Sequence, residues 1–589
     1  MDSDIKVIFS QKPAQTILGR ASPLAPTQLE EFRGIPYGTV PGRWRHSVVR
    51  DVLPTDRFDA TKNGPQCPQP DLFANSDTYQ SYLPWPIDVG ESEFDCLNLF
   101  IVRPRPQALK QADLSYEDGP LPVYVVIHGG GFGFGAATDP MWDPSRLLLE
   151  GLAENKPFIA VGINYRLSIF GFGYSSVIAT MQTDAAERRG GNFGMGDQRT
   201  ALRWISRHIA AFGGDPSRVT IAGQSAGGVS VHAHILEAKF GRHPPLFRRA
   251  IQQSGALGAM RPVSVAEVEE TRWQAMYKAL NLTAASTASK LDALLALSVA
   301  DLLAAAGGIG WIVFAPVRDE LSIGSDPDGL WVDLGRLDSA EEVPKQSEAE
   351  PLAVLLGDCA EEVRILVGLM MNPKFKTLHC LEDLTQLVST EYPELAPAAL
   401  DELWTAYKLS GPGPRDGFAK GFRAFVTDAQ FASPVDCARA ELSADADQKR
   451  QRLDGQPARL TETRSFLFKT GNPFPGPSHG IAHHCIDLIY IYDCFHDALT
   501  GVDHASAAST APAGPLASNA LLVQHVQTQW VSFIVDDTVR GSEQVCTTFE
   551  TDRTVSERMM SEDPEWTLRR KRFAVLGKYA GVVKKLLGY

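Results

Sequence analysis

The chain has 589 residues, of which 44% are hydrophobic and 21% charged, an ordinary globular composition that excludes a disordered or fibrous protein. Its net charge of −14 is spread along the sequence, which argues against partners such as nucleic acid or an anionic membrane surface. The eight cysteines are scattered without a CxxC pair, so neither a disulfide scaffold nor a zinc ribbon is predicted.

Nothing in the sequence marks export or membrane insertion. The N-terminal segment, residues 1–10, carries acidic residues where a secretory signal needs positive charge. No stretch reaches the roughly 18 uninterrupted apolar residues of a membrane span. We therefore expect a cytoplasmic protein without a membrane span.

The apolar residues predict strands that alternate with helices. Strands are expected at residues 31–38, 95–102, 121–128, 158–165, 219–222, 250–255, 311–317, 353–358 and 465–469. Helices are expected at residues 197–212, 263–303, 381–431, 520–535 and 566–587, and loops at residues 338–350 and 505–515. Such alternation predicts a doubly wound α/β fold around a large, mostly parallel sheet, whose functional sites lie at the carboxyl ends of the strands.

A glycine-flanked serine follows the strand at residues 219–222. The segment Gly223-Gln-Ser225-Ala-Gly227 fits a nucleophile turn, in which a strained serine lifts its hydroxyl above the sheet and a helix begins behind it. That helix would direct backbone N–H groups and its positive dipole end at the reacting atom. The pattern is short and recurs by chance, so it needs support from the rest of the chain.

A serine nucleophile also needs a base, a group that orients the base, and donors for the oxyanion. The run His128-Gly-Gly-Gly131 follows a buried strand, and the backbone N–H groups of Gly130 and Gly131 suit the last role together with that of Ala226. The other interpretation of such a run is a tight turn without chemical function.

The base is harder to choose, because thirteen histidines are available. The densest region holds His479, His483 and His484 beside Cys485. A metal site from these four residues is the other interpretation, but adjacent histidines rarely converge on one ion.

The orienting group must be a carboxylate between the serine and the histidine in chain order. Seventy acidic residues make spacing alone useless. Glu361 and Glu362 lie just past a predicted strand end and are suitably placed.

A series of motifs in one order resembles the type-B carboxylesterases, the family of carboxylesterases, cholinesterases and certain fungal lipases. The motifs are Phe32-Arg-Gly-Ile-Pro-Tyr37, Asp95-Cys-Leu-Asn-Leu99, His128-Gly-Gly-Gly-Phe132, Asn164-Tyr-Arg-Leu167, Gly191-Asn-Phe-Gly-Met-Gly-Asp-Gln198, Phe212-Gly-Gly-Asp-Pro216, Gly223-Gln-Ser-Ala-Gly227, Ala250-Ile-Gln-Gln-Ser-Gly255 and Phe314-Ala-Pro-Val317. The resemblance implies a single α/β-hydrolase domain over residues 1–589, with helical cap regions about residues 260–310 and 380–435.

The resemblance also implies a catalytic triad of Ser225, Glu362 and His484. The family's Gly-x-x-x-Asp-Glu-Gly falls on residues 357–363, where Glu361 and Val363 depart from the pattern, so a register shift onto Glu361 stays open. The family's His-x-x-(Asp/Glu)-Leu-x-Tyr falls on residues 484–490 and selects His484 over its neighbour. The implied oxyanion donors are Gly130, Gly131 and Ala226.

Two departures from the family matter. The residue before the nucleophile is usually Glu and is here Gln224, which removes a negative charge near the base. A weaker preference for cationic esters is therefore expected, which argues against a choline esterase. Cys67 and Cys96 match the family's N-terminal disulfide, yet a reducing compartment would keep them as thiols. The sequence does not decide whether this disulfide forms.

We therefore expect a serine esterase that cleaves a neutral, apolar small-molecule ester and needs neither metal nor cofactor. The candidate pocket residues are Phe132, Gln224, Trp311 and Phe314, with loops at residues 84–89 and 309–314, although core packing explains the aromatic residues equally well. An acyltransferase or lactone-forming enzyme with the same triad is the first alternative, and a non-catalytic binding protein on this fold is the second. The oligomeric state cannot be predicted.

Overall fold

The structure is a computed structural model of the whole chain. It describes residues 5–11, 14–70, 89–182, 189–326, 329–337, 351–365, 378–395, 397–409, 415–443, 451–508, 517–536 and 544–587. The predicted loop at residues 338–350 and most of the predicted loop at residues 84–89 lie outside these ranges.

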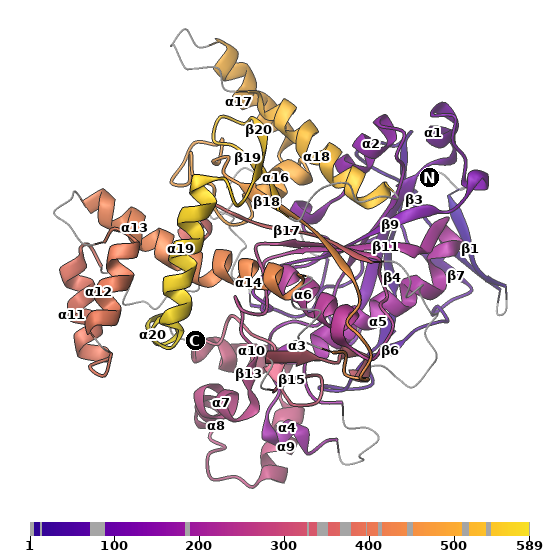
Figure 1. The fold of residues 1–589 in the computed structure, drawn as a ribbon. Helices are drawn as coiled ribbons and strands as arrows, with labels where there is room; N and C mark the ends of the chain where they lie inside the picture. The colour runs from indigo at the N-terminus through magenta and orange to yellow at the C-terminus, as the bar shows by residue number, and fades with distance from the viewer. Residues whose placement is uncertain are drawn as a thin grey trace.

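A large sheet forms the centre of the molecule (Figure 1). Its eleven described strands lie in the order β20 (Val555–Met559), β19 (Val545–Phe549), β18 (Thr461–Phe468), β17 (Leu352–Cys359), β12 (Arg249–Gln253), β11 (Gly214–Gln224), β9 (Leu121–Ile127), β10 (Ile159–Ile163), β8 (Asn98–Pro104), β4 (Leu29–Pro36) and β3 (Arg20–Ala21). The pairs from β19 to β10 are parallel, whereas β20, β8, β4 and β3 join antiparallel. The predicted large, mostly parallel sheet is therefore confirmed.

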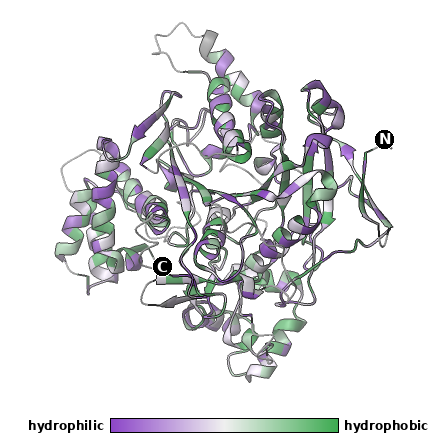
Figure 2. Ribbon diagram, turned by 45° about the vertical axis from the view of Figure 1, so that its right-hand side comes forward, coloured by the Kyte–Doolittle hydropathy of each residue, from purple (hydrophilic) through white to green (hydrophobic). Residues whose placement is uncertain are grey.

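Apolar residues cover both faces of this sheet, and they appear as green segments along its strands in Figure 2. On β9, Val123, Val125 and Ile127 join the core that includes α5 (Phe193–His208) and α6 (Ala226–Phe240). Tyr124 and Val126 point the other way, into the core that includes α2 (Ser145–Ala153), α16 (Ile486–Ile491) and α18 (Asn519–Val535). Burial on both faces explains why the strand lacks the polar alternation of a half-exposed one.

Helices and small sheets surround the centre. The remaining α-helices are α1 (Pro106–Gln111), α3 (Ser168–Phe172), α4 (Ser176–Ala179), α7 (Val265–Val268), α8 (Gln274–Ala279), α9 (Thr287–Ala296), α10 (Val299–Gly308), α11 (Leu381–Glu391), α12 (Pro397–Ala406), α13 (Arg415–Thr427), α14 (Ser433–Glu441), α17 (His496–Ala508), α19 (Pro564–Lys578) and α20 (Ala580–Leu587). Single turns are η2 (Tyr116–Asp118), η3 (Pro140–Trp142), η4 (Ile209–Phe212), η5 (Glu269–Trp273), η6 (Leu334–Leu337), η7 (Glu362–Ile365) and η9 (Asp428–Ala432). One small sheet contains β1 (Lys6–Gln11), β2 (Ala14–Leu18) and β7 (Arg57–Asp59). The other small sheets pair β5 (Gly38–Thr39) with β6 (Val48–Val49), β13 (Val263–Ser264) with β14 (Val317–Arg318), and β15 (Ile323–Asp326) with β16 (Gly329–Val332).

One predicted element is wrong, and a second is wrong in its first residues. The strand expected at residues 311–317 is irregular up to its last residue, because its backbone bonds to loops: Phe314 N–H donates to Gly131 O at 2.9 Å and Val317 N–H to the Asn192 side chain at 2.7 Å. The first residues of the loop expected at 505–515 instead end α17, and residues 509–515 lie outside the described ranges.

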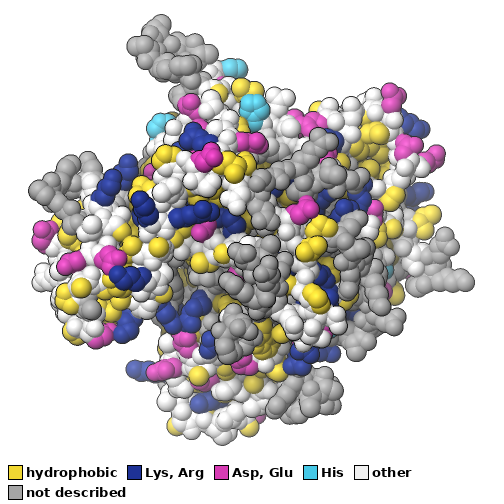
Figure 3. Space-filling model, in the orientation of Figure 1, with side chains coloured by type: hydrophobic (Ala, Val, Ile, Leu, Met, Phe, Trp, Pro, Cys, Tyr) yellow, Lys and Arg dark blue, Asp and Glu magenta, His cyan; other side chains and the backbone are white. Residues whose placement is uncertain are grey.

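The surface carries both signs of charge. Lys and Arg side chains are interspersed with Asp and Glu over the described part of the face in Figure 3. Among the described residues no single helix is long and apolar enough to cross a membrane, although α9 and α10, bent by 115° to each other, pass that test as a pair.

Candidate active site

Ser225 stands between β11 and α6 in a strained conformation, with φ 59° and ψ −126°. Such a backbone costs on the order of 1–3 kcal/mol for a non-glycine residue. Hydrogen bonds fix it on both sides, from Ser225 N–H to Gln253 O at 3.0 Å and from Val229 N–H to Ser225 O at 2.9 Å. Glycine is required two residues later, because a Cβ on Gly227 would lie 2.1 Å from the Ile127 carbonyl oxygen.

The glycine-rich loop after β9 borders this turn, since a Cβ on Gly129 would lie 3.1 Å from the Ser225 Cβ. Gly130 and Gly131 have φ of 112° and 58°. Within the described part of the chain, their N–H groups donate to no protein acceptor. Ala226 begins α6, so its N–H group also lacks an intrahelical partner. These three donors are therefore available beside Ser225.

Glu362 and His484 meet at the end of β17. The His484 Nδ1 lies 2.6 Å from Glu362 Oε2, and both side chains are buried. The other carboxylate oxygen accepts the Cys359 N–H at 2.7 Å, which fixes the carboxylate plane. Because the carboxylate accepts a hydrogen bond from Nδ1–H, the lone pair of the neutral imidazole lies on Nε2.

The neighbouring candidates point elsewhere. The Glu361 side chain is 38% exposed and pairs with Arg423 at 3.6 Å. The His483 Nδ1 lies 2.6 Å from the His484 carbonyl oxygen, and its Nε2 lies 2.9 Å from the Asn472 amide nitrogen. Burial lowers the pKa of His483 to about 4, which keeps it neutral.

Gln224 lies at the Nε2 side of the His484 ring. Its side-chain nitrogen lies 3.1 Å from His484 Nε2, and its side-chain oxygen accepts a hydrogen bond from the Cys485 thiol at 3.2 Å. Among the contacts of the described residues, Ser225 makes no hydrogen bond to His484. The contact expected between hydroxyl and imidazole is thus replaced by one from the residue before the nucleophile.

Two neighbours of the site were not predicted. The Phe431 ring lies on His484, with ring centroids 4.8 Å apart, and no sequence signal marked it. On β12, the strand beside β11, Gln253 donates to Asp487 at 2.7 Å, and burial raises the pKa of Asp487 to about 6. Asp487 belongs to the same sequence motif as His484, and this motif could have marked it as a neighbour of the site.

The predicted pocket residues are buried in the core. Phe132 packs on Phe172 at 4.4 Å, and Trp311 stacks on Phe314 at 4.7 Å. Their contact with a substrate stays a prediction. A cavity of about 470 Å³ lies elsewhere, between α18 and the β19–β20 hairpin, lined by Ala517, Leu521, His525, Thr528, Gln529, Arg553, Thr554 and Val555.

The structure also bears on the predictions for a disulfide and for a metal site. Cys67 and Cys96 are buried free thiols, so the possible bridge is not formed in the structure. The two thiols form a hydrogen bond, which together with burial raises the pKa of Cys96. Among the described residues, no group of three or more His, Cys, Asp or Glu side chains could hold a metal ion.

Known proteins resemble this chain in sequence and fold. A family model described as "Carboxylesterase family" matches residues 10–542. The chain is 38% identical over 232 residues to a secreted lipase of Arthroderma benhamiae, an alignment that covers 39% of this chain and 36% of the lipase. It is 33% identical over 252 residues to a carboxylesterase-like protein of Byssochlamys spectabilis that is named inactive, covering 42% and 38% of the two chains.

The matched part thus spans less than half the length of these two relatives. A solved structure titled PNB esterase superposes with a TM-score of 0.62 at 24% identity, over 97% of this chain and 99% of the other. That likeness supports the α/β-hydrolase fold.

Proposed function

Because the chain belongs to the carboxylesterase family, we propose that it hydrolyses carboxylic esters through an acyl-enzyme formed on Ser225. The observation that carries the proposal is the buried Glu362–His484 pair at 2.6 Å, next to the strained turn that holds the serine. The inactive relative means that family membership alone does not decide activity, so the site geometry is the main support.

In the first half-reaction, the Ser225 Oγ attacks the ester carbonyl carbon while His484 Nε2 takes its proton. Glu362 keeps the proton on Nδ1 and stabilises the imidazolium that forms. The N–H groups of Gly130, Gly131 and Ala226 hold the tetrahedral oxyanion, and each such donor typically contributes about 3 kcal/mol of barrier lowering. His484 then protonates the leaving alcohol.

In the second half-reaction, water gives its proton to His484 and attacks the acyl-enzyme, which releases the acid and restores the serine. This chemistry uses no metal or cofactor. The Gln224 amide has to leave His484 Nε2 before the first proton transfer, because one lone pair cannot serve both donors.

We further propose a neutral, apolar ester as substrate. Gln224 brings no charge to the base, and the aromatic residues Phe132, Trp311 and Phe314 are the pocket candidates. A cytoplasmic location stays a prediction.

The test is turnover of p-nitrophenyl esters of increasing acyl chain length by the wild type and by Ser225→Ala. We expect loss of detectable turnover in the variant and loss of covalent labelling by a fluorophosphonate. Ser217→Ala, an exposed serine on the same strand, is the matched control and should keep both.

A folded wild type that neither turns over esters nor labels would overturn the proposal and favour a non-catalytic protein. Labelling combined with ester formation in the presence of an alcohol, and no release of acid, would favour acyl transfer over hydrolysis.

A further inference from the structure

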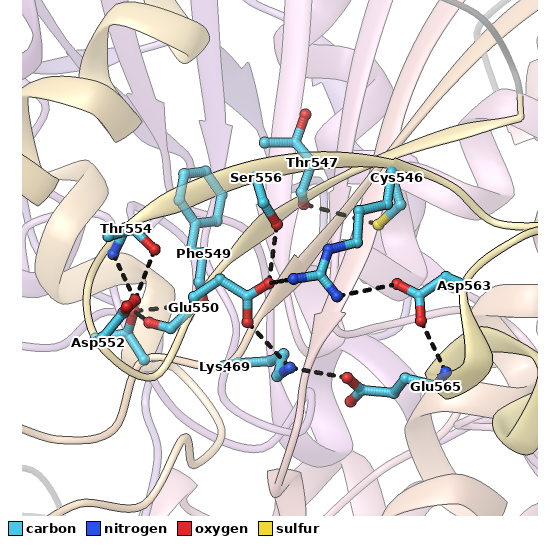
Figure 4. A network of polar contacts seen from close by, with 12 residues as sticks. Lys469, Cys546, Thr547, Phe549, Glu550, Asp552, Thr554, Ser556, Asp563 and Glu565 are labelled. Atoms are coloured by element: carbon cyan, nitrogen blue, oxygen red, sulfur yellow. Dashed lines mark hydrogen bonds and ion pairs between the residues drawn. The ribbon is translucent and has the colours of Figure 1, made fainter.

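Helix α19 lies beyond the last residue matched by the family model, between the sheet and the α11–α13 helices (Figure 1). Its first turn is tied to the ends of two strands. Lys469, which follows β18, pairs with Glu565 at 2.8 Å and with Glu550 at 3.0 Å, and Asp563 caps the helix (Figure 4). The start of α19 is therefore fixed relative to the sheet.

The middle of α19 is tied to the strand that leads to the proposed catalytic acid. Arg569 pairs with Asp358 on β17 at 2.6 Å, with side chains only 7% and 2% exposed. The guanidinium also lies over Trp566 at 4.7 Å and over Phe573 at 5.6 Å. This desolvated, stacked pair fixes the strand end more strictly than an exposed ion pair would.

Asp358 is close to Glu362 in space as well as in sequence. The residue after it, Cys359, donates its N–H to the Glu362 carboxylate at 2.7 Å. The pKa of Asp358 is raised to about 6, because burial and the charge of Glu362, which raise it, outweigh Arg569, which lowers it. Two carboxylates thus share one buried region, and Arg569 neutralises the one that does not serve His484.

The next turn of α19 is tied to the segment on the other side of His484. Arg572 pairs with Asp428 at 2.7 Å, and Asp428 also accepts a hydrogen bond from Tyr407 at 3.1 Å. Asp428 begins the π-helical turn η9, which carries the Phe431 ring that lies on His484. One helix therefore contacts the segments that hold the acid and the imidazole ring.

We propose that α19 positions the catalytic pair, and that Arg569 is a positioning residue that holds the β17 end so that the Glu362 carboxylate meets His484. This inference rests on the proposed function, because it assigns Arg569 a role in the same triad. Arg569 itself does not contact the reacting atoms.

The experiment compares Arg569→Gln with Lys578→Gln in the full chain. Lys578 lies on the same helix and makes an exposed ion pair with Glu402 at 2.6 Å, so its variant is the matched control. For p-nitrophenyl ester hydrolysis we expect a 10- to 100-fold lower kcat for Arg569→Gln with KM within threefold, and both values within twofold for Lys578→Gln. Arg569→Lys, which keeps the charge but not the stacking, should recover part of the loss.

Amide hydrogen exchange provides a readout that does not depend on activity. We expect faster exchange over residues 358–363 in Arg569→Gln and no change in Lys578→Gln. If the wild type is inactive, the proposed function fails, and the exchange data still decide whether α19 holds this segment.

Unchanged kcat and unchanged exchange in folded Arg569→Gln would overturn the inference. If Arg569→Gln does not fold, Arg569→Lys and Asp358→Asn replace it, and wild-type kcat in both would overturn the inference equally.

Discussion

At the residue scale, the two adjacent carboxylates past β17 have opposite surroundings. Glu362 is buried and bonded to His484, whereas the Glu361 side chain is 38% exposed and pairs with Arg423. Val363, which stands where the family has glycine, is buried in the core beside α11–α13. Its burial fixes the rotation of this turn and directs the preceding carboxylate inward.

The first prediction at this scale separates the two carboxylates. We expect Glu362→Gln to lower kcat by about 10³- to 10⁴-fold, because an amide no longer holds the proton on Nδ1 or stabilises the imidazolium. Glu361→Gln, of the same size and charge change, should stay within about threefold of the wild type, since surface ion pairs contribute little. Steady-state release of p-nitrophenol at saturating ester measures both, and an equal loss in Glu361→Gln would move the acid by one residue.

Most proposed site residues could be predicted because their signals are local. The strained serine, the glycine loop and the histidine motif each occupy fewer than ten consecutive residues, and local backbone chemistry fixes them. The contacts of Gln224 and Phe431 with His484 could not be predicted, because they join parts of the chain brought together only by the fold. The burial of Phe132, Trp311 and Phe314 agrees with core packing, the alternative that the sequence left open for them.

At the element scale, the sequence predicts strands and helices well where one periodicity dominates. The predicted strand at residues 353–358 lies within β17, and the helix predicted at 520–535 matches α18 within one residue. The error at 311–317 has a physical cause, since an apolar run can be buried by aromatic stacking as well as by a sheet. Trp311 packs edge-on against Trp273 and stacks on Phe314 instead of pairing with a strand.

The prediction at the element scale concerns the stability of the protein when either of two glycines in helices is replaced by alanine. Gly227→Ala should lower the urea midpoint and destabilise the protein by at least about 1–3 kcal/mol, because its Cβ meets the backbone oxygen of Ile127. Gly501→Ala, inside α17 with no atom within 4 Å of the added Cβ, should stabilise it by about 0.5–1 kcal/mol. Urea unfolding followed by tryptophan fluorescence measures both shifts, and equal shifts in one direction would contradict the geometry of the α6 start.

At the scale of the whole molecule, burial sets how stability depends on pH. It lowers the pKa of His46 and His234 to about 3 and that of His128 and His483 to about 4. Buried carboxyls act in the opposite sense, since burial raises the pKa of Asp139 to about 7, that of Asp358 and Asp487 to about 6, and that of Asp428 and Asp493 above its ordinary value.

As pH falls below about 6.5, unfolded histidines take up protons that these buried ones cannot, so the unfolded state is favoured. The carboxyls bind protons in the folded state first, and their contribution to stability grows from about pH 7 down to about pH 4. The histidines and the carboxyls therefore oppose each other below about pH 6.5, and replacing one histidine isolates its share of the pH dependence.

We therefore predict that the urea midpoint of His234→Gln rises relative to that of the wild type as the pH is lowered from 7 to 5, because one proton fewer is taken up on unfolding. The new amide can bond to the Gln198 side chain, which the imidazole contacts at 3.2 Å. His504→Gln, an exposed histidine on α17, is the control and should follow the wild type. A difference in midpoint between His234→Gln and the wild type that stays constant from pH 7 to 5 would contradict the lowered pKa of His234.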